Sequence, residues 1–552
     1  MESFLEYLTS NHCEALCRLL AKERIKQGAS KKMPRNTKLF VQTIMPYRND
    51  WVRLRKQTRA KGLSKETAGV LVIKKTIASH RKAAVNGITK STKYLAELDK
   101  YTAKLTGMVS GELPISFSAE DFAILPKFKG DEGKDTIYRP LCVYNNLDTK
   151  TLISAASAYF TQHFDEHLHE EILSYRPRRM YHGVKTNTSG ADAIKAIREY
   201  LDKHKQQNIY VAECDIQKFY DIINHDVVLD CFDTLALKAG IPEYGQIRRV
   251  LKAYLDSYGF VPNILNLNEN KNYWYQPSQR HRGKIEGSHM FKWVKEEDFL
   301  LAYTEEEFAQ VRNQLGVPQG GALSCVISNV VLNDVDQAIL SEKDDDTLFV
   351  RYGDDIILMH TDKEKCEHLL ELYKQSLTDH KLIYHRFEDF AGLKDGEKNT
   401  KKFWKGKSKP VFLWGPGPGN ASEWIGFVGY EFHRNGYTRL RISTIDKKFG
   451  AINKAYHKCL ESKAQDPSKI VEKARKRMES LPSSMDKFTE LQKNDYLFHQ
   501  LKNLDRYRFQ KLKKLDTALS KRCNEKVNLT EYFESDDSYS FFRTKYEKTQ
   551  KV

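Results

Sequence analysis

Two adjacent carboxylates lie between two short apolar runs in the stretch Phe349-Val350-Arg351-Tyr352-Gly353-Asp354-Asp355-Ile356-Ile357-Leu358-Met359. Apolar, β-branched runs on either side of a Gly-Asp pair predict a β-hairpin with Asp354 and Asp355 at its turn. Carboxylates held together on hydrophobic strands repel each other and lose hydration, so such a pair is typical of a site for a hard divalent cation such as Mg²⁺. We therefore expect one more acid to approach from elsewhere in the chain.

A candidate for this acid ends another β-rich run, in Ile209-Tyr210-Val211-Ala212-Glu213-Cys214-Asp215-Ile216-Gln217-Lys218-Phe219-Tyr220-Asp221. Asp215 is the third carboxylate that we expect at the site. Between the two acidic segments lies a Gly/Pro-rich loop, Leu315-Gly316-Val317-Pro318-Gln319-Gly320-Gly321-Ala322-Leu323-Ser324, which opens onto a predicted helix. Its glycines allow the backbone to approach a flat ligand closely. Each segment alone also fits an ordinary turn, so their order along the chain carries the interpretation.

In this order the three segments resemble motifs A, B and C of the reverse-transcriptase palm. Two upstream segments, Tyr138-Arg139-Pro140-Leu141 and Ser174-Tyr175-Arg176-Pro177-Arg178-Arg179, resemble the fingers motifs of prokaryotic reverse transcriptases. Downstream, Trp424-Ile425-Gly426-Phe427-Val428-Gly429-Tyr430 resembles the primer grip, motif E. The resemblance extends from about Phe122 to Ser443. It implies an α+β right-hand polymerase fold with fingers, a palm of antiparallel sheet plus helices, and a helical thumb.

The resemblance also implies an RNA-directed DNA polymerase with a two-metal site. Asp215, Asp354 and Asp355 would be catalytic, and together with Ile216 they would hold two Mg²⁺ ions, with Mn²⁺ as an alternative. Phosphoryl transfer needs charge neutralisation and alignment of this kind more than covalent help from the protein. The family's nucleotide-binding positions fall on Arg139, Lys134, Tyr220, Gln319 and Gly320, and its primer-grip positions on Phe427, Gly429 and Tyr430.

Several positively charged positions stay open. The planar guanidinium of Arg139 suits the incoming triphosphate, and Lys134 or Lys129 would add a second charge. A lysine acting as general acid toward pyrophosphate is expected in motif D, where the candidates are Lys398, Lys401 and Lys402. Cys325 stands where many relatives have proline, which removes no catalytic group.

Sugar selection is predicted from the residue five positions after Asp215, which is Tyr220. Viral RNA-dependent RNA polymerases also carry a Tyr-Gly-Asp-Asp turn, but they place an aspartate at that position to bind the 2′ hydroxyl. The ring of Tyr220 would collide with a ribose 2′ hydroxyl and so select deoxynucleotides. Its neighbour Phe219 is expected to turn into the core.

The composition agrees with a nucleic-acid partner. The chain has 552 residues, a net charge of +17 and 40% hydrophobic residues, so it is long enough for several domains and favours a polyanionic partner. We expect a cytoplasmic protein without a membrane partner, because no run of 18 or more apolar residues occurs and the N-terminus lacks a secretory pattern.

The nine cysteines include no C-x-x-C pair, which argues against a disulfide framework and against a structural zinc site. A reducing compartment is expected. His163, His167 and His169 are close enough in sequence to suggest metal ligands. We interpret them instead as core or surface histidines, because the family has a plain helix there.

Three regions are expected along the chain. Residues 1–110 read as a basic, helical N-terminal extension, residues 111–443 as fingers and palm, and residues 444–552 as a helical thumb and C-terminal tail. The interval between Asp215 and Pro318 is long for the family, which predicts an insertion at about residues 255–310. A second irregular stretch covers residues 394–420.

The subgroup is inferred from what surrounds the palm. The sequence shows neither the cysteine pairs of an intron-type endonuclease nor an acidic pattern of RNase H or integrase after motif E, and retron enzymes are usually shorter. The chain therefore looks most like the defence-associated, abortive-infection or unknown-group reverse transcriptases, for which a dedicated noncoding RNA template, protein priming and homo-oligomers are implied. Hydroxyls in Glu531–Ser540 could prime DNA, although a flexible tail is the preferred interpretation. The alternatives are a group II intron-type (maturase) or retron-type enzyme of a mobile element, and an inactive RNA-binding scaffold.

Overall fold

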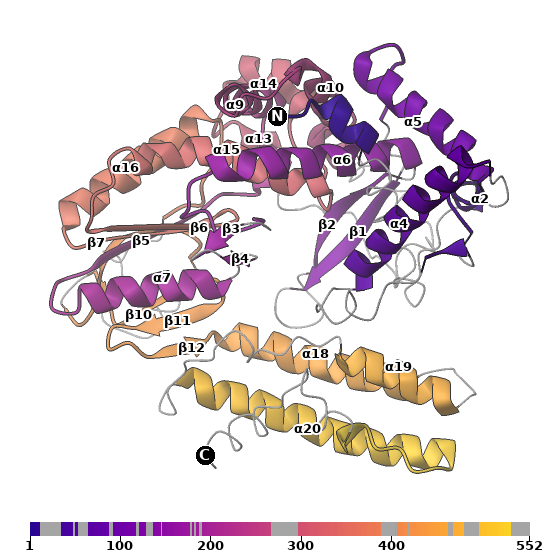
Figure 1. Cartoon of the computed structure of the whole chain (residues 1–552). Coiled ribbons are helices and arrows are strands. Elements are labelled where there is room, and N and C mark those ends of the chain that lie inside the picture. The colour runs from indigo at the N-terminus through magenta and orange to yellow at the C-terminus, as the bar shows by residue number, and fades with distance from the viewer. Residues whose placement is uncertain are drawn as a thin grey trace.

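The computed structural model of the chain describes residues 1–10, 35–47, 50–52, 65–87, 92–117, 121–128, 136–144, 146–176, 179–181, 184–186, 190–266, 296–387, 403, 406–417, 420–461, 467–479 and 496–531 (Figure 1). Residues 267–295, the middle of the insertion expected at residues 255–310, lie outside them, as do Lys129, Lys134, Lys398, Lys401 and Lys402 and most of Glu531–Ser540. The domain boundaries themselves stay predictions.

A five-stranded sheet forms the centre of the molecule, in the strand order β6-β7-β5-β8-β9. Its members are β5 (Tyr210–Asp215), β6 (Thr347–Tyr352), β7 (Asp355–His360), β8 (Lys409–Trp414) and β9 (Ala421–Ser422). All neighbouring pairs are antiparallel except β8 with β9. The apolar runs on either side of the Gly-Asp pair are therefore β6 and β7, as predicted.

Side chains alternate between the two faces of this sheet along each strand. Both faces are buried, and each contributes to a different hydrophobic core. On β5, Ala212 and Cys214 belong to a core shared with helices α15 (Ala322–Leu340) and α16 (Lys363–Asp379). Val211 belongs to a second core, which is shared with α7 (Gly190–Lys203). Burial on both sides explains why the strands read as continuous apolar runs rather than as an alternating pattern.

Further helices surround α15. They are α6 (Leu147–Phe164), α9 (His225–Lys238) and α10 (Tyr244–Asp256), with the short helices η3 (Asp165–His167), α8 (Phe219–Ile222), η4 (Val261–Leu265), α13 (Glu296–Phe299), α14 (Glu305–Val311) and η5 (Arg312–Gln314) nearby. By length and composition α15 could cross a membrane, but 72% of its apolar window is buried inside the molecule, as in the core helix of a folded domain.

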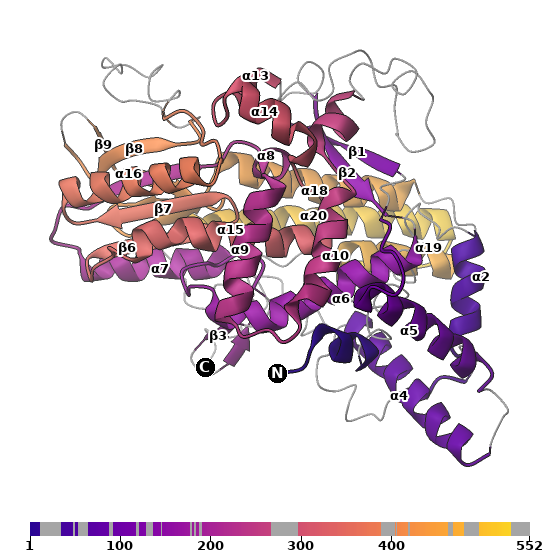
Figure 2. The same cartoon turned by 90° about the horizontal axis from the view of Figure 1, so that it is seen from above.

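The N-terminal part lies at the far end from the central sheet (Figure 2). It consists of a helix at residues 4–10 and of α2 (Arg35–Ile44), α4 (Lys65–Val85) and α5 (Tyr94–Ser110). Residues of these helices, such as Phe4 and Leu98, join the same hydrophobic core as α6 and α15. Two two-stranded sheets follow in the chain, β1 (Asp121–Phe128) with β2 (Thr136–Val143) and β3 (Arg179–Tyr181) with β4 (Val184–Thr186).

The C-terminal part begins with a three-stranded sheet of β10 (Trp424–Phe427), β11 (Tyr430–His433) and β12 (Thr438–Leu440). The long helices α18 (Ile442–Leu460), α19 (Pro467–Glu479) and α20 (Tyr496–Cys523) follow and pack on one another (Figure 1). The side chain of Gln500 bonds both backbone groups of Leu440, which fastens α20 to β12. With a helical thumb beside an antiparallel palm sheet, the expected α+β right-hand polymerase fold is confirmed.

Candidate active site

The register between β5 and β7 brings the predicted acids together. Asp215 is the antiparallel partner of Asp355, so the two side chains leave the same face of the sheet as neighbours. Asp354 is in the hairpin turn between Tyr352 and Asp355, and Gly353 supplies the positive φ of 75° that the first position of a type II′ turn requires. Three carboxylates from two distant segments therefore converge at one end of the sheet.

The electrostatics of the site are those of crowded negative charges. The surrounding protein displaces hydrating water from the Asp355 carboxyl, and Asp215 and Asp354 place like charges beside it. Both effects raise the pKa of Asp355 far above the usual range of a carboxyl. The Asp355 side chain still reaches solvent, whereas Asp215 is 3% exposed. Oxygen ligands from clustered carboxylates are what Mg²⁺ and similar hard cations prefer, so the donor set fits the expected metal site.

The sequence did not single out Lys407, whose ammonium forms an ion pair with the Asp215 carboxylate. Burial alone would lower the pKa of Lys407, but the charges of Asp215, Asp355 and Asp354 raise it above its usual value. Two residues further on, Lys409 pairs in the same way with buried Glu213. Glu213 and Asp215 on β5 have the same two-residue spacing as Lys409, which begins β8, and Lys407, which precedes it, and this spacing is the signal that could have revealed the contact.

A buried ion pair lies under the hairpin turn between β6 and β7. Arg351 and Asp336 are both 0% exposed, and Arg351 Nε donates to Asp336 Oδ2 over 2.7 Å. Burial raises the pKa of Asp336 to about 6, although the guanidinium opposes this. A second arm of the guanidinium, Nη1, donates to the carbonyl oxygen of Gly353 at 3.1 Å. The pair on α15 and β6 therefore holds the turn that carries Asp354.

The other backbone group of the turn is also fixed. The Gly353 N–H donates to Ser174 Oγ at 2.8 Å, and Asn329 Nδ2 donates to the Ser174 carbonyl at 2.9 Å. Ser174 belongs to the second fingers motif, and Asn329 lies on α15. The turn is thus bonded on both sides by residues far from it in sequence.

Replacing Asp336 by alanine tests this support. We expect a loss of about 3–5 kcal/mol in the free energy of unfolding, because the charge of Arg351 would stay buried without its partner. Urea denaturation measures the change, and Asp345→Ala, on the exposed turn before β6, serves as control with an expected effect within about 0.5 kcal/mol. Equal effects of the two substitutions would contradict a role for the ion pair.

A pH titration tests the crowding of the carboxylates. An acid whose pKa is raised by folding keeps its proton while the unfolded chain has lost it, so stability falls as the pH rises above about 4 toward the raised pKa. We expect metal-free wild-type protein to lose stability across this interval more steeply than Asp355→Asn. Denaturation at several pH values in the presence of a chelator provides the measurement. Parallel curves for the two proteins would refute the prediction.

The Gly/Pro-rich loop packs directly on the segment that follows Asp215. Gln319 Nε2 donates to Asp221 Oδ1 at 2.6 Å, and the N–H of Val317 donates to the Tyr220 carbonyl at 2.8 Å. Gly316 has φ +87°, and a Cβ there would stand 3.0 Å from the Asp221 carbonyl oxygen, so only glycine fits. Gly320, at φ 86°, lies on the exposed side of the loop. The loop is therefore held beside the carboxylates.

Tyr220 lies near Asp354 of the β6–β7 turn. Burial raises the pKa of its hydroxyl, and Tyr175, Cys325 and Asp354 raise it further. Phe219, by contrast, is 1% exposed and belongs to the core, as expected. The two adjacent aromatic rings thus point to different environments, and the Tyr220 ring is the one near the acids.

Of the other predicted residues, Ile216 follows Asp215 directly, is buried and forms a β-bridge with Tyr384. Arg139 lies on β2 opposite Leu125, and Lys134 is outside the described residues. Three residues after Arg139, the N–H of Cys142 donates to the Gln319 carbonyl at 3.2 Å. This strand of the fingers therefore reaches the loop.

The predicted primer-grip residues form the hairpin of β10 and β11. Phe427 pairs with Tyr430, and the intervening Val428 and Gly429 have φ values of 47° and 82°, as in a type I′ turn. Phe427 is buried in the core below the palm sheet, and Tyr430 packs against both that core and the first cluster of the thumb. The hairpin thus connects palm and thumb.

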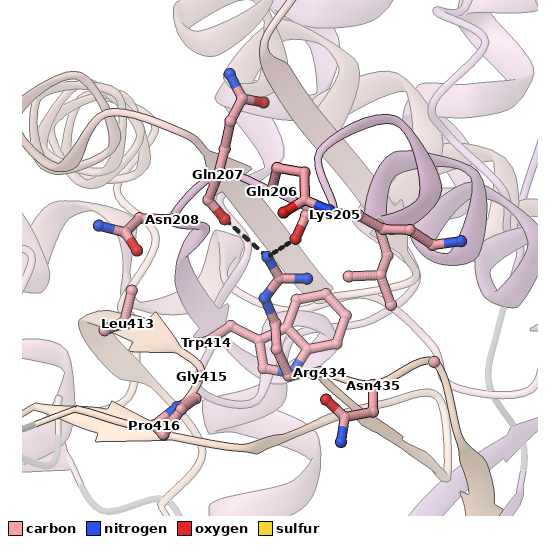
Figure 3. Close-up of a pocket in the computed structure, with 12 residues that line it drawn as sticks. Lys205, Gln206, Gln207, Asn208, Leu413, Trp414, Gly415, Pro416, Arg434 and Asn435 are labelled. Carbon is pink, nitrogen blue, oxygen red and sulfur yellow. Dashed lines mark hydrogen bonds between the residues drawn. The ribbon is translucent and has the colours of Figure 1, made fainter.

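A pocket of about 550 Å³ lies between the end of α7, the end of β8 and the turn between β11 and β12 (Figure 3). Asp215, Asp354 and Asp355 do not line it. Arg434 crosses it: its Nη2 donates to the carbonyls of Lys205 and Gln207 at 3.0 and 2.7 Å, beside the Trp414 ring. Because the Arg434 guanidinium bonds these backbone carbonyls, it fastens the three-stranded sheet of β10, β11 and β12 to the segment that follows α7.

Comparison with known proteins gives one family match. Residues 129–386 match the family described as "Reverse transcriptase (RNA-dependent DNA polymerase)". A search of curated proteins found no match. Among solved structures, the chain is similar to telomerase from Candida albicans with a fragment of telomeric RNA, at 12% identity and a TM-score of 0.36, over 94% of this chain and 83% of that one. It is similar to apo telomerase from Candida tropicalis at 12% identity and a TM-score of 0.37, over 91% and 79%.

The family match makes residues 129–386 a reverse transcriptase domain. The class of the enzyme is RNA-directed DNA polymerase, as the motifs predicted. Enzymes of this class copy an RNA template and use divalent metal ions.

Proposed function

We propose that the chain adds deoxynucleotides to a primer on an RNA template, with two Mg²⁺ ions held by Asp215, Asp354 and Asp355. The observation that carries this proposal is the pairing of Asp215 with Asp355, next to Asp354, in a sheet whose strands are mostly apolar and whose other buried charges, such as Glu213 and Arg351, have partners of opposite charge. A protein without metal chemistry gains nothing from like charges in this position. The same observation speaks against the inactive scaffold.

The residues of the site have separate tasks. Magnesium ions bound there would activate the primer 3′ hydroxyl and neutralise the leaving pyrophosphate. Asp215 is held rigidly, since its N–H donates to Ser408 Oγ at 3.1 Å. Asp354 is placed by the bonds to Gly353. Lys407 neutralises Asp215, and the lysines expected in motif D stay a prediction because they lie outside the described residues.

Substitution of Asp354 by asparagine removes one negative oxygen ligand without changing the size of the side chain. We expect DNA synthesis to be abolished, because the divalent cations lose a charged ligand. Primer extension on an RNA template with Mg²⁺ measures the effect, and Asp345→Asn on the exposed turn before β6 is the matched control. Extension at wild-type rate by Asp354→Asn would overturn the proposed site.

Substitution of Tyr220 tests the selection of deoxynucleotides. Tyr220→Ala would remove the ring that blocks a 2′ hydroxyl, so incorporation of ribonucleotides should rise by at least about 10-fold relative to deoxynucleotides, which corresponds to 1.4 kcal/mol of discrimination. Tyr220→Phe keeps the ring and should keep the discrimination. Competition between the two nucleotide types in single-turnover extension gives the ratio. If alanine and phenylalanine variants discriminate alike, the steric argument is wrong.

For the biological role, we propose a bacterial enzyme of antiphage defence that copies a dedicated noncoding RNA in the cytoplasm. The proposal rests on the resemblance of the motifs to defence-associated reverse transcriptases and on the helical segments that flank the domain. Protein priming and homo-oligomers belong to the same proposal. Sequencing of nucleic acid that copurifies with wild-type protein, beside a variant lacking Asp354 and Asp355, tests it. One recurrent RNA and its complementary DNA would support it, whereas intron or retron RNA would favour a mobile-element enzyme.

A further inference from the structure

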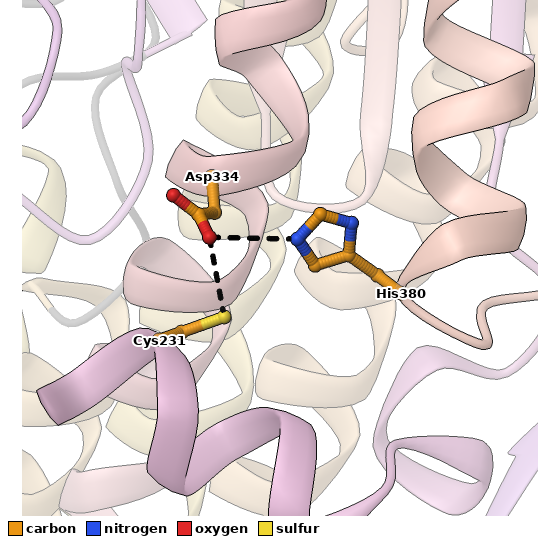
Figure 4. A group of neighbouring side chains, drawn as sticks. All are labelled: Cys231, Asp334 and His380. Atoms are coloured by element: carbon orange, nitrogen blue, oxygen red, sulfur yellow. Dashed lines mark hydrogen bonds and ion pairs between the residues drawn. The ribbon is translucent and has the colours of Figure 1, made fainter. Parts of the chain in front are cut away.

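Cys231, Asp334 and His380 point toward one another at one side of α15 (Figure 4). Cys231 comes from α9, Asp334 from α15, and His380 directly follows α16. One ligand atom from each lies within 4.8 Å of the others. Because the three residues are far apart in the chain, the cluster has no linear sequence motif that would predict it.

The distances are those expected around a small metal ion. Cys231 Sγ lies 3.7 Å from Asp334 Oδ2, and His380 Nε2 lies 3.6 Å from the same oxygen. Tetrahedral zinc with bonds of about 2.0–2.3 Å separates its ligands by roughly 3.3–3.8 Å. Two of the three edges already have this length, so an ion would need only small side-chain rotations.

The imidazole of His380 is oriented toward the cluster by a second contact. Its Nδ1 is 2.7 Å from the carbonyl oxygen of Ser376. A carbonyl only accepts, so Nδ1 carries a proton, and Nε2 is the nitrogen that can bind an ion in exchange for any proton of its own. A backbone carbonyl that fixes the second nitrogen in this way is the usual support of a metal-binding histidine.

We propose that Cys231, Asp334 and His380 bind one transition-metal ion, with Zn²⁺ as the favoured ion and water as its fourth ligand. A thiolate, an imidazole and a carboxylate form a donor set for zinc rather than for Mg²⁺ or Ca²⁺, which prefer oxygen alone. Cys231 is buried, while Asp334 is 44% exposed and leaves a route from solvent. The bound ion would join α9, α15 and the end of α16, and this role does not depend on the proposed function.

The experiment uses the full-length protein, stripped with a chelator and then titrated with Zn²⁺ or Co²⁺. We expect one equivalent to bind, Co²⁺ to give a thiolate charge-transfer band, and Zn²⁺ to raise the melting temperature. Cys231→Ser should abolish the charge-transfer band, and Cys231→Ser and His380→Gln should each weaken binding by about 100-fold or more. Matched controls are Cys523→Ser in the thumb and His368→Gln on the exposed face of α16, which should bind as wild type.

Several outcomes decide the proposal. Zinc binding that survives in both Cys231→Ser and His380→Gln, or a Co²⁺ complex without a thiolate band, would overturn it. Circular dichroism of each variant shows whether a loss of binding comes from misfolding. If a variant is misfolded, Asp334→Asn, at a half-exposed position, is used in its place. Asp354→Asn should bind zinc normally while it fails to extend a primer, so failure of this site and failure of the proposed function are distinguishable.

Discussion

The antiparallel register of β5 and β7 is the constraint on which the arrangement of the site depends, because it sets Asp215 opposite Asp355. Two unit charges about 4 Å apart repel by about 4 kcal/mol at an effective dielectric constant of 20, and a whole domain is stable by only about 5–15 kcal/mol. The strands tolerate this because their remaining side chains are buried on both faces, and because Lys407 neutralises Asp215. The repulsion is kept at the end of the sheet, where cations can reach it.

The ion pair of Arg351 and Asp336 has a different purpose from that of the surface pairs. A fully buried pair adds little stability compared with well-packed apolar residues, because both charges lose their hydration. What it provides is position: the same guanidinium holds the carbonyl of Gly353, and Ser174 holds its N–H. A two-residue turn with both backbone groups of its glycine fixed has little freedom to rotate, so Asp354 is presented in one direction before any cation binds.

The fold and the acids were predictable from sequence because their signals are local. The Gly-Asp pair between apolar runs specifies a hairpin, and the loop around Gln319 precedes its helix directly. Lys407 was missed because it contacts Asp215 across 192 positions, and only the strand pairing of β5 and β8 brings them together. The pair of Arg351 and Asp336 was not predicted either. Arg351 lies within an apolar run, and Asp336 lies on a helix whose packing against that run no local pattern reveals. Lys134 lies outside the described residues, and for Arg139 only the backbone is described.

Helix α15 links the two clusters of polar residues. Asp334 and Asp336 are two positions apart, which on an α-helix means about 200° of rotation, so they leave opposite sides of it. Asp336 contacts Arg351 beneath the β6–β7 turn, while Asp334 contacts Cys231 and His380 on the other side. Contacts on opposite sides fix the rotation of the helix better than contacts on one side, and the loop that carries Gln319 leads directly into its first turn. If α15 rotated about its axis, Asp334 and Asp336 would move together, so the β6–β7 turn that Arg351 holds would move as well. The charge of the cluster around Asp334, by contrast, is separated from Asp215, Asp354 and Asp355 by the helix itself.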